Sequence, residues 1–341
     1  MIYLDYSATT PVAYDVLESY TRATKDFMGN PNSLHSLGVK SKALMHSAVK
    51  QISDIFNVLE SEITFTAGAT MSNNLALIGT ALANMKYGNH ILVSKLEHPS
   101  IYSICKYLEN IGFEIGYIDN TEEGLIDFEN LKHQMRDDTI LVSVCAVNSE
   151  MGIRQPLKMI RQIIKKENPH TFLHSDMTQA LGKIPVNFHD VDLASATAHK
   201  IYGPKGIGLF YKNSRVPFTP LLYGSGQTNM YNPGTPPVPL IVAFSKAIRL
   251  ATVDLDKREN FIKRLNEKIV NELKKYEGIK INQTKICIPQ ILNISFDNIK
   301  AETFLHALEE YEIYVSTNTA CSSGEISTAV MAVYNDKKRA S

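Results

Sequence analysis

The chain has 341 residues, 44% of them apolar, which is enough to bury a large core and suggests two domains. Lys and Arg together number 35, as do Asp and Glu, so a polyanionic partner such as nucleic acid is not indicated. No basic leader precedes an apolar stretch, and no apolar run reaches the roughly 18 residues of a membrane span. We therefore expect a cytoplasmic globular protein, without membrane contact, that acts on a small molecule.

Short apolar runs alternate with helical patterns through the first two thirds of the chain. The predicted strand and helix pairs are, in chain order, 62–66 and 73–85, 91–94 and 100–110, 114–118 and 128–135, and 140–147 and 157–166. Further strands are predicted over 172–175, 193–197 and 207–211. This alternation is typical of an α/β fold with a mostly parallel sheet, in which ligands bind at the carboxyl ends of the strands.

The last third of the chain has a different pattern. One long charged helix is predicted over 238–276, and its charges have the spacing of a solvated helix face. Strand, strand, helix and strand signals follow at 279–282, 291–296, 301–311 and 314–316. We expect a large domain over 15–251 and a smaller α/β domain formed by residues 1–14 and 252–341.

The four cysteines are widely spaced, so neither a disulfide framework nor a structural zinc site is expected. Three of them lie in apolar surroundings typical of buried thiols: Cys105, Cys145 and Cys287. Cys321 lies instead among small polar residues typical of a loop, where a thiol can reach solvent. His170 and His174 have a metal-like spacing but fall on a predicted strand, so we expect no metal site.

The segment HKIYGPKG at 199–206 follows a predicted strand and contains the most informative residue, Lys200. An amine so placed can hold an aldehyde cofactor, and Asp176 on an upstream strand would face the ring nitrogen of pyridoxal phosphate. TAGAT at 66–70 joins a strand to a helix, where exposed backbone N–H groups suit a phosphate. His98 ends another strand and could stack on a planar cofactor, although a histidine at a helix start is the plainer interpretation.

These motifs resemble those of the cysteine desulfurases of the NifS/IscS type, within the class V aminotransferase fold. The match covers nearly the whole chain, from YLDYSATTP at 3–11 and GNPNSLH at 29–35 to ACSS at 320–323. The resemblance implies the type I fold of pyridoxal-phosphate enzymes, a homodimer, and L-cysteine as substrate. The implied products are L-alanine and a persulfide on Cys321, whose sulfur passes to a scaffold or carrier protein for iron–sulfur clusters or other thio-cofactors.

The resemblance also implies residue roles. Lys200 is the Schiff-base lysine, Cys321 accepts the sulfur, and His98 is the catalytic imidazole stacked on the ring. Asp176 pairs with the ring nitrogen, and Gln179 bonds the phenolic oxygen. The remaining cofactor-binding positions are Ala69, Thr70, Asn148, Thr197 and His199, with Thr235 reaching in from the other subunit.

The chain departs from the family pattern in several places. Ser149 stands where the family's second asparagine contacts cofactor and substrate, and the segment before Gly234 lacks the usual basic residues. The sequence ends before the segment whose arginine binds the substrate carboxylate, with Arg339 as the nearest replacement. We therefore expect a small domain shortened at its C-terminus and roughly ten- to hundredfold weaker substrate binding. The alternatives are an impaired homologue that keeps the cofactor and acts as an assembly partner, and a selenocysteine lyase or aminotransferase of the same fold.

Overall fold

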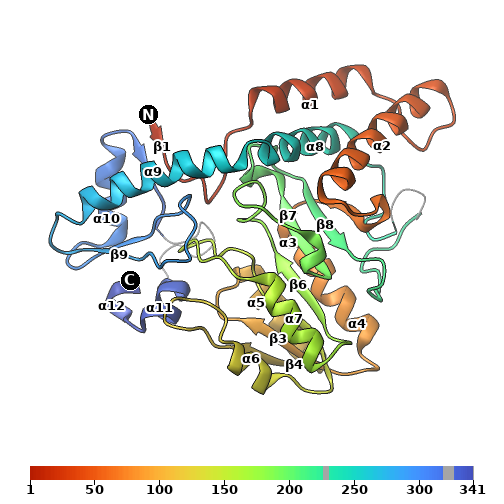
Figure 1. The fold of residues 1–341 in the computed structure, drawn as a ribbon. Helices are drawn as coiled ribbons and strands as arrows, with labels where there is room; N and C mark the ends of the chain where they lie inside the picture. The colour runs from red at the N-terminus through yellow and green to blue at the C-terminus, as the bar shows by residue number, and fades with distance from the viewer. Residues whose placement is uncertain (226–229, 318–325, 341) are drawn as a thin grey trace.

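The computed structural model describes residues 1–225, 230–317 and 326–340 (Figure 1). Its central element is a seven-stranded sheet with the order β2-β8-β7-β6-β5-β3-β4. Its strands are β2 (Ile63–Thr66), β3 (His90–Ser94), β4 (Glu114–Ile118), β5 (Thr139–Ser143), β6 (Phe172–Asp176), β7 (Leu193–Thr197) and β8 (Gly208–Lys212). β8 runs antiparallel to β2 and β7, and the other pairs are parallel. The predicted mostly parallel sheet is confirmed.

The inner strands are buried on both faces. Every residue of β3, β5, β7 and β8 is buried, whereas the edge strand β4 is largely accessible. Continuous apolar runs such as ILVS in β3 and TILVS in β5 are the sequence signature of such strands. β5 is shorter than predicted, but Val144 N and Ala146 N still donate to His174 O and Asp176 O, at 3.1 and 3.0 Å.

Helices cover both faces of the sheet. One face carries α1 (Tyr14–Asp26), α2 (Ser36–Phe56), α6 (Phe128–Gln134), α7 (Leu157–Glu167) and α8 (Val238–Thr252). The other carries α5 (Pro99–Asn110) and a helical run formed by α3 (Ala69–Asn74), a π-helical turn (Leu75–Gly79) and α4 (Thr80–Asn84). Leu92 packs on the first side, and Ile91 and Val93 pack on the second, because strand side chains alternate between faces.

The predicted single helix over 238–276 is wrong. Two helices stand there, α8 and α9 (Leu255–Leu273), and Figure 1 shows α9 extending from the end of α8 over the smaller strands. The helix is interrupted because Asp254 adopts a left-handed conformation with φ of 53° after the extended Val253. The Arg258 guanidinium then caps α8 by donating to the carbonyls of Leu250 and Ala251.

The smaller region contains two short sheets. β9 (Ile279–Ile281) and β10 (Ile294–Phe296) pair antiparallel, and β1 (Ile2–Tyr3) pairs in parallel with β11 (Ile313–Tyr314). Its helices are α10 (Ala301–Glu309), α11 (Thr328–Tyr334) and α12 (Lys337–Ala340), and short 3-10 turns elsewhere are Glu60–Glu62, Phe188–Asp190 and Ala198–Lys200. The pairing of β1 with β11 places the first residues of the chain beside the C-terminal strands and helices. The domain boundaries stay a prediction. Across the described ranges, no helix is both long and apolar enough to span a bilayer.

Candidate active site

A cavity of about 1610 Å³ opens at the carboxyl ends of β3, β6 and β7. Apolar residues of α9, α10 and β10 line its other end. Most of the residues singled out from the sequence line this cavity: Ala69, Thr70, His98, Asp176, Gln179, Thr197, His199 and Lys200. The fold therefore brings together side chains from segments more than 100 positions apart, at the edge of the sheet where ligands were expected.

The other predicted residues lie elsewhere. The Asn148 amide is buried and holds its own loop, donating to Leu96 O at 3.1 Å and accepting from Met151 N at 2.8 Å. Its neighbour Ser149 lines the cavity instead. Thr235 is exposed and is not among the lining residues, and Cys321 lies outside the described residues.

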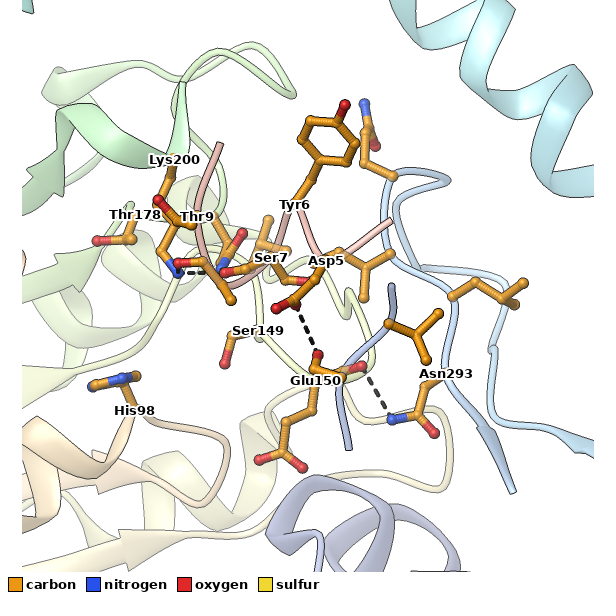
Figure 2. Close-up of a pocket in the computed structure, with 18 of the residues that line it drawn as sticks. Asp5, Tyr6, Ser7, Thr9, His98, Ser149, Glu150, Thr178, Lys200 and Asn293 are labelled. Carbon is orange, nitrogen blue, oxygen red and sulfur yellow. Dashed lines mark hydrogen bonds between the residues drawn. The ribbon is translucent and has the colours of Figure 1, made fainter. Parts of the chain in front are cut away.

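Lys200 ends a 3-10 turn, Ala198–Lys200, that follows β7. Its Nζ donates to the carbonyl of Ala8 at 2.6 Å and to that of Ser7. Figure 2 shows the N-terminal segment that contains Ser7 passing beside the Lys200 amine, with His98 on the opposite side of the cavity. The segment is anchored there because Thr10 N donates to His199 O at 2.8 Å. The amine is thus aimed into the cavity.

Asp176 and His98 stand at the ends of neighbouring elements. Asp176 is 6% exposed, and its carboxylate accepts from Thr178 N at 2.9 Å and from Asn73 Nδ2 at 2.8 Å. His98 is the N-cap of α5, and its Nδ1 accepts from Ser100 N at 3.1 Å. Burial lowers the pKa of His98, Lys200 lowers it further, and Asp176 opposes the shift. The site thus pairs a buried acid with a neutral imidazole.

Sequence reasoning missed Glu97, the buried neighbour of His98. Its Oε1 accepts from Ser94 Oγ at 2.7 Å and from Cys145 N at 2.6 Å, which ties the end of β3 to the segment after β5. Burial raises the pKa of this carboxyl to about 8, and Asp176 adds to the rise. The group is therefore mostly protonated at neutral pH and holds the cavity edge without adding a charge.

The loop before α3 is shaped to receive an anion. Among the residues that the structure describes, no side chain caps α3 at Gly68, which leaves the N–H groups of its first turn available to a ligand. β8 runs directly beneath this loop, where a Cβ on Gly208 would lie 2.6 Å from the Gly68 carbonyl carbon and 2.8 Å from Ala196 O. Only glycine permits that approach, which brings Thr197 and the loop to one end of the cavity.

Several basic side chains lie near Lys200. Burial and the charges of Lys200, Lys205 and Lys183 lower the pKa of His199 to about 4. Lys183, which sequence reasoning missed, donates to Gln179 Oε1, and burial together with Lys200 lowers its pKa to about 7. The other end of the Gln179 amide donates to Ser7 O at 2.9 Å. The amines of Lys200 and Lys205, which both line the cavity, favour an anionic ligand, whereas the lowered pKa of His199 leaves its ring neutral at neutral pH.

Arg339 lines the cavity from the C-terminal side. Its Nε donates to Asn282 Oδ1 at 2.6 Å and its Nη2 to Ile281 O at 3.0 Å, while the guanidinium stacks 3.5 Å from the centre of the Tyr334 ring. The arginine is therefore tied to the end of β9, and its binding of a substrate carboxylate stays a prediction.

Comparison with known proteins identifies the family. The model of the aminotransferase class-V family matches residues 2–341. Cysteine desulfurase IscS of Dictyoglomus turgidum is 36% identical over 95% of this chain and 83% of its own length, and cysteine desulfurase IscS 1 of Archaeoglobus fulgidus is 37% identical over 95% and 85%. A solved structure described as a NifS-like protein has a TM-score of 0.94 at 35% identity, covering 99% of this chain and 91% of that one. SspA in complex with cysteine has a TM-score of 0.86 at 30% identity, covering 100% and 96%.

The fold is that of the type I pyridoxal-phosphate enzymes. The chain belongs to the class-V aminotransferase family and, within it, to the group of NifS and IscS cysteine desulfurases. The resemblance drawn from the sequence is thereby confirmed, and the family implies pyridoxal phosphate as cofactor.

His174 predicts how stability depends on pH. It is fully buried in β6, with Nδ1 2.9 Å from Ser143 Oγ and Nε2 3.1 Å from Ser195 Oγ, and burial lowers its pKa from 6.5 to about 4. The folded state thus binds this proton more weakly than the unfolded state, so the contribution is present above pH 6.5 and is lost as pH falls toward 4. We expect a loss of up to about 3 kcal/mol in the free energy of unfolding, measured by urea denaturation across this range.

His174→Gln should flatten that pH dependence, whereas His46→Gln, at an exposed position, should leave it unchanged. Parallel profiles for wild type and His174→Gln would show that His174 is not the titrating group.

Proposed function

We propose that this protein is a pyridoxal-phosphate-dependent cysteine desulfurase that removes sulfur from L-cysteine. The observation that carries the proposal is the convergence of Lys200, Asp176 and His98 on one cavity from three separate strand ends. The names of the relatives support the reaction, and a related structure is described as a complex with cysteine.

The residues present fit the cofactor. The uncapped start of α3, with Ala69 and Thr70, suits its phosphate, as do Thr197 and His199. Asp176 suits a protonated ring nitrogen because it is a buried carboxylate held by two donors. When bound, pyridoxal phosphate supplies an electron sink that stabilises the charge developing at an amino acid's Cα.

Lys200 is the base in this proposal. Its amine reaches the cavity and is held by the carbonyls of Ser7 and Ala8, so its lone pair is available once the amine is deprotonated. Removing the Cα proton of cysteine is the task of this amine. His98 lies on the side of the cavity opposite Lys200, and its neutral imidazole can stack on the cofactor ring without adding charge. Gln179, fixed at both ends of its amide, would donate to the cofactor's phenolic oxygen.

Cys321 is the proposed sulfur acceptor. Its thiolate attacks the sulfur of the activated cysteine, so a sulfur–sulfur bond forms as the carbon–sulfur bond breaks. The organic product leaves as L-alanine after protonation, and Cys321 carries the persulfide. A second thiol on a scaffold or carrier protein then takes this sulfur for iron–sulfur clusters or other thio-cofactors.

The absorbance of the purified holo-protein, before and after addition of L-cysteine, tests the function when alanine is quantified in the same sample. We expect a yellow protein whose band shifts with cysteine and which forms many equivalents of alanine. Lys200→Arg keeps the charge but lacks a nucleophilic amine, and should lower alanine formation by about 10²- to 10⁴-fold. A stable band without alanine would identify a cofactor-binding homologue that lacks the reaction, and no band at all would reject Lys200 as the cofactor lysine.

Cys321→Ser tests the sulfur acceptor. The variant should keep the yellow colour and lose the persulfide, because the hydroxyl cannot form the sulfur–sulfur bond. The persulfide is measured by alkylation and mass spectrometry after one turnover. Cys287→Ser is the matched control, since Cys287 is half-buried, does not line the cavity and should not affect the reaction. Undiminished sulfide release from Cys321→Ser would remove this thiol from the mechanism.

A homodimer is the proposed assembly. Large apolar side chains are exposed along the N-terminal helices and a later loop: Tyr14, Leu17, Met28, Leu34, Leu37, Val39, Leu222 and Tyr223. Exposed apolar side chains that gather in a few segments favour an interface, so we assign these helices and this loop to contact with a second copy of the chain. Thr235, exposed on the same chain, would then contact the cofactor phosphate in the other subunit.

Light scattering tests the dimer. Leu34, which is 97% exposed, and Leu37 are both changed to Glu, which should give a monomer because two charges would be buried at the contact. The variant should also bind the cofactor more weakly, since Thr235 of the other subunit is lost. Phe261→Glu, at an exposed position on α9, should stay dimeric. A wild type that is monomeric, or a double variant that is still dimeric, would contradict the assignment.

A further inference from the structure

A chain of hydrogen bonds links the acid and the imidazole of the site. Asn73 lies in α3 and is fully buried; its Nδ2 donates to Asp176 Oδ2 at 2.8 Å and to Ser100 Oγ at 3.1 Å. Ser100 Oγ in turn lies 2.9 Å from His98 Nδ1. Each of these residues also lines the cavity, so the two groups that flank a ligand are connected through the wall of the site.

The orientation of the Asn73 amide is fixed. Both contacts are made by Nδ2, while Oδ1 is buried and has no hydrogen-bond partner in the described part of the chain. Reversing the amide would bring Oδ1 against the carboxylate of Asp176, and two acceptors would then face each other. An unpaired buried carbonyl is unfavourable and usually has a specific reason. Here the reason is that Asp176 and Ser100 both require a donor.

The Ser100 backbone N–H sets the protonation of His98, because His98 Nδ1 accepts from it at 3.1 Å. Ser100 Oγ, which accepts from Asn73, can donate its own proton to the same ring nitrogen. A ring nitrogen that accepts carries no proton, so the neutral ring carries its proton on Nε2. The pKa of His98, lowered by burial and by Lys200 although Asp176 opposes, agrees with a neutral ring.

We propose that Asn73 is a positioning residue that holds the Asp176 carboxylate and ties it, through the Ser100 hydroxyl, to the imidazole of His98, whose Nε2–H tautomer is held by the Ser100 backbone N–H and hydroxyl. This link would orient the Asp176 carboxylate and the His98 imidazole together around the ligand that they would hold. The role in cofactor binding rests on the proposed function, whereas the tautomer is a property of the protein side chains alone.

Two pairs of variants separate the parts of this link. Asn73→Leu removes both donors with nearly the same shape. Asn84→Leu removes another buried amide of the same helical run, which donates to Thr80 O and does not line the cavity. Ser100→Ala breaks the contact between the hydroxyl and His98 but keeps the bond between Asn73 and Asp176. Ser103→Ala is its control, at an exposed serine of α5 that donates to Pro99 O.

The measurements are the ring ¹⁵N shifts of His98 in histidine-labelled holo-protein and the dissociation constant of pyridoxal phosphate. Wild type and both controls should show Nε2–H alone. Ser100→Ala removes the hydroxyl but keeps the backbone N–H that donates to Nδ1, so it should keep the Nε2–H tautomer, move the Nδ1 shift and leave cofactor binding nearly unchanged. Asn73→Leu should also move the Nδ1 shift, because the Ser100 hydroxyl loses its donor, and should weaken cofactor binding by about tenfold or more, because Asp176 loses a donor to its charge.

Equal effects of Asn73→Leu and Asn84→Leu would overturn the proposal, as would an Nδ1–H tautomer of His98 in wild type. If Asn73→Leu does not fold, an Nδ1 shift unchanged in Ser100→Ala still rejects the link. A wild type that forms no alanine but shows the expected tautomer would reject the proposed function and leave the link in place.

Discussion

The buried carboxylate of Asp176 is the constraint on which the site depends. An ionised group at the end of an inner strand is costly unless donors replace water, and here backbone and amide groups from Thr178 and Asn73 do so. Those donors require α3 to pass close to the end of β6, and α3 in turn starts from the loop that Gly208 allows β8 to approach. The acid, the anion-binding loop and the sheet order are therefore parts of one arrangement.

Electrostatics divides the cavity into two ends. Lys200 supplies positive charge at one end, where burial and, after it, the charge of Lys200 lower the pKa of Lys183 to about 7 and that of His199 to about 4, so the His199 ring is neutral at neutral pH. Asp176 supplies negative charge on the other side of the lysine, while Glu97 is kept protonated by burial. A ligand with an anionic group and a cationic ring satisfies both ends, which is the charge distribution of pyridoxal phosphate.

Much of the fold was predictable because the inner strands are buried on both faces and therefore have mainly apolar sequences, as in β3 and β5. The prediction failed over 238–276, where the left-handed Asp254 divides the helix without any glycine or proline to signal a break. The site was predicted where a residue type implies its chemistry, as for Lys200 and His98. Asn73 and Lys183 were missed because an asparagine or lysine in a helical or turn pattern is ordinarily solvent-exposed, and their importance comes from burial.

The sequence by itself determined the family, the alternation of strands and helices, and the identity of the reactive groups, because these depend on local residue patterns and motif order. Only the tertiary structure decided which groups meet: the N-terminal carbonyls of Ser7 and Ala8 beside Lys200, and the link from Asp176 through Asn73 to Ser100 and His98. Such contacts join residues far apart in the chain. Their geometry follows from the packing of strands and helices, which no local pattern specifies.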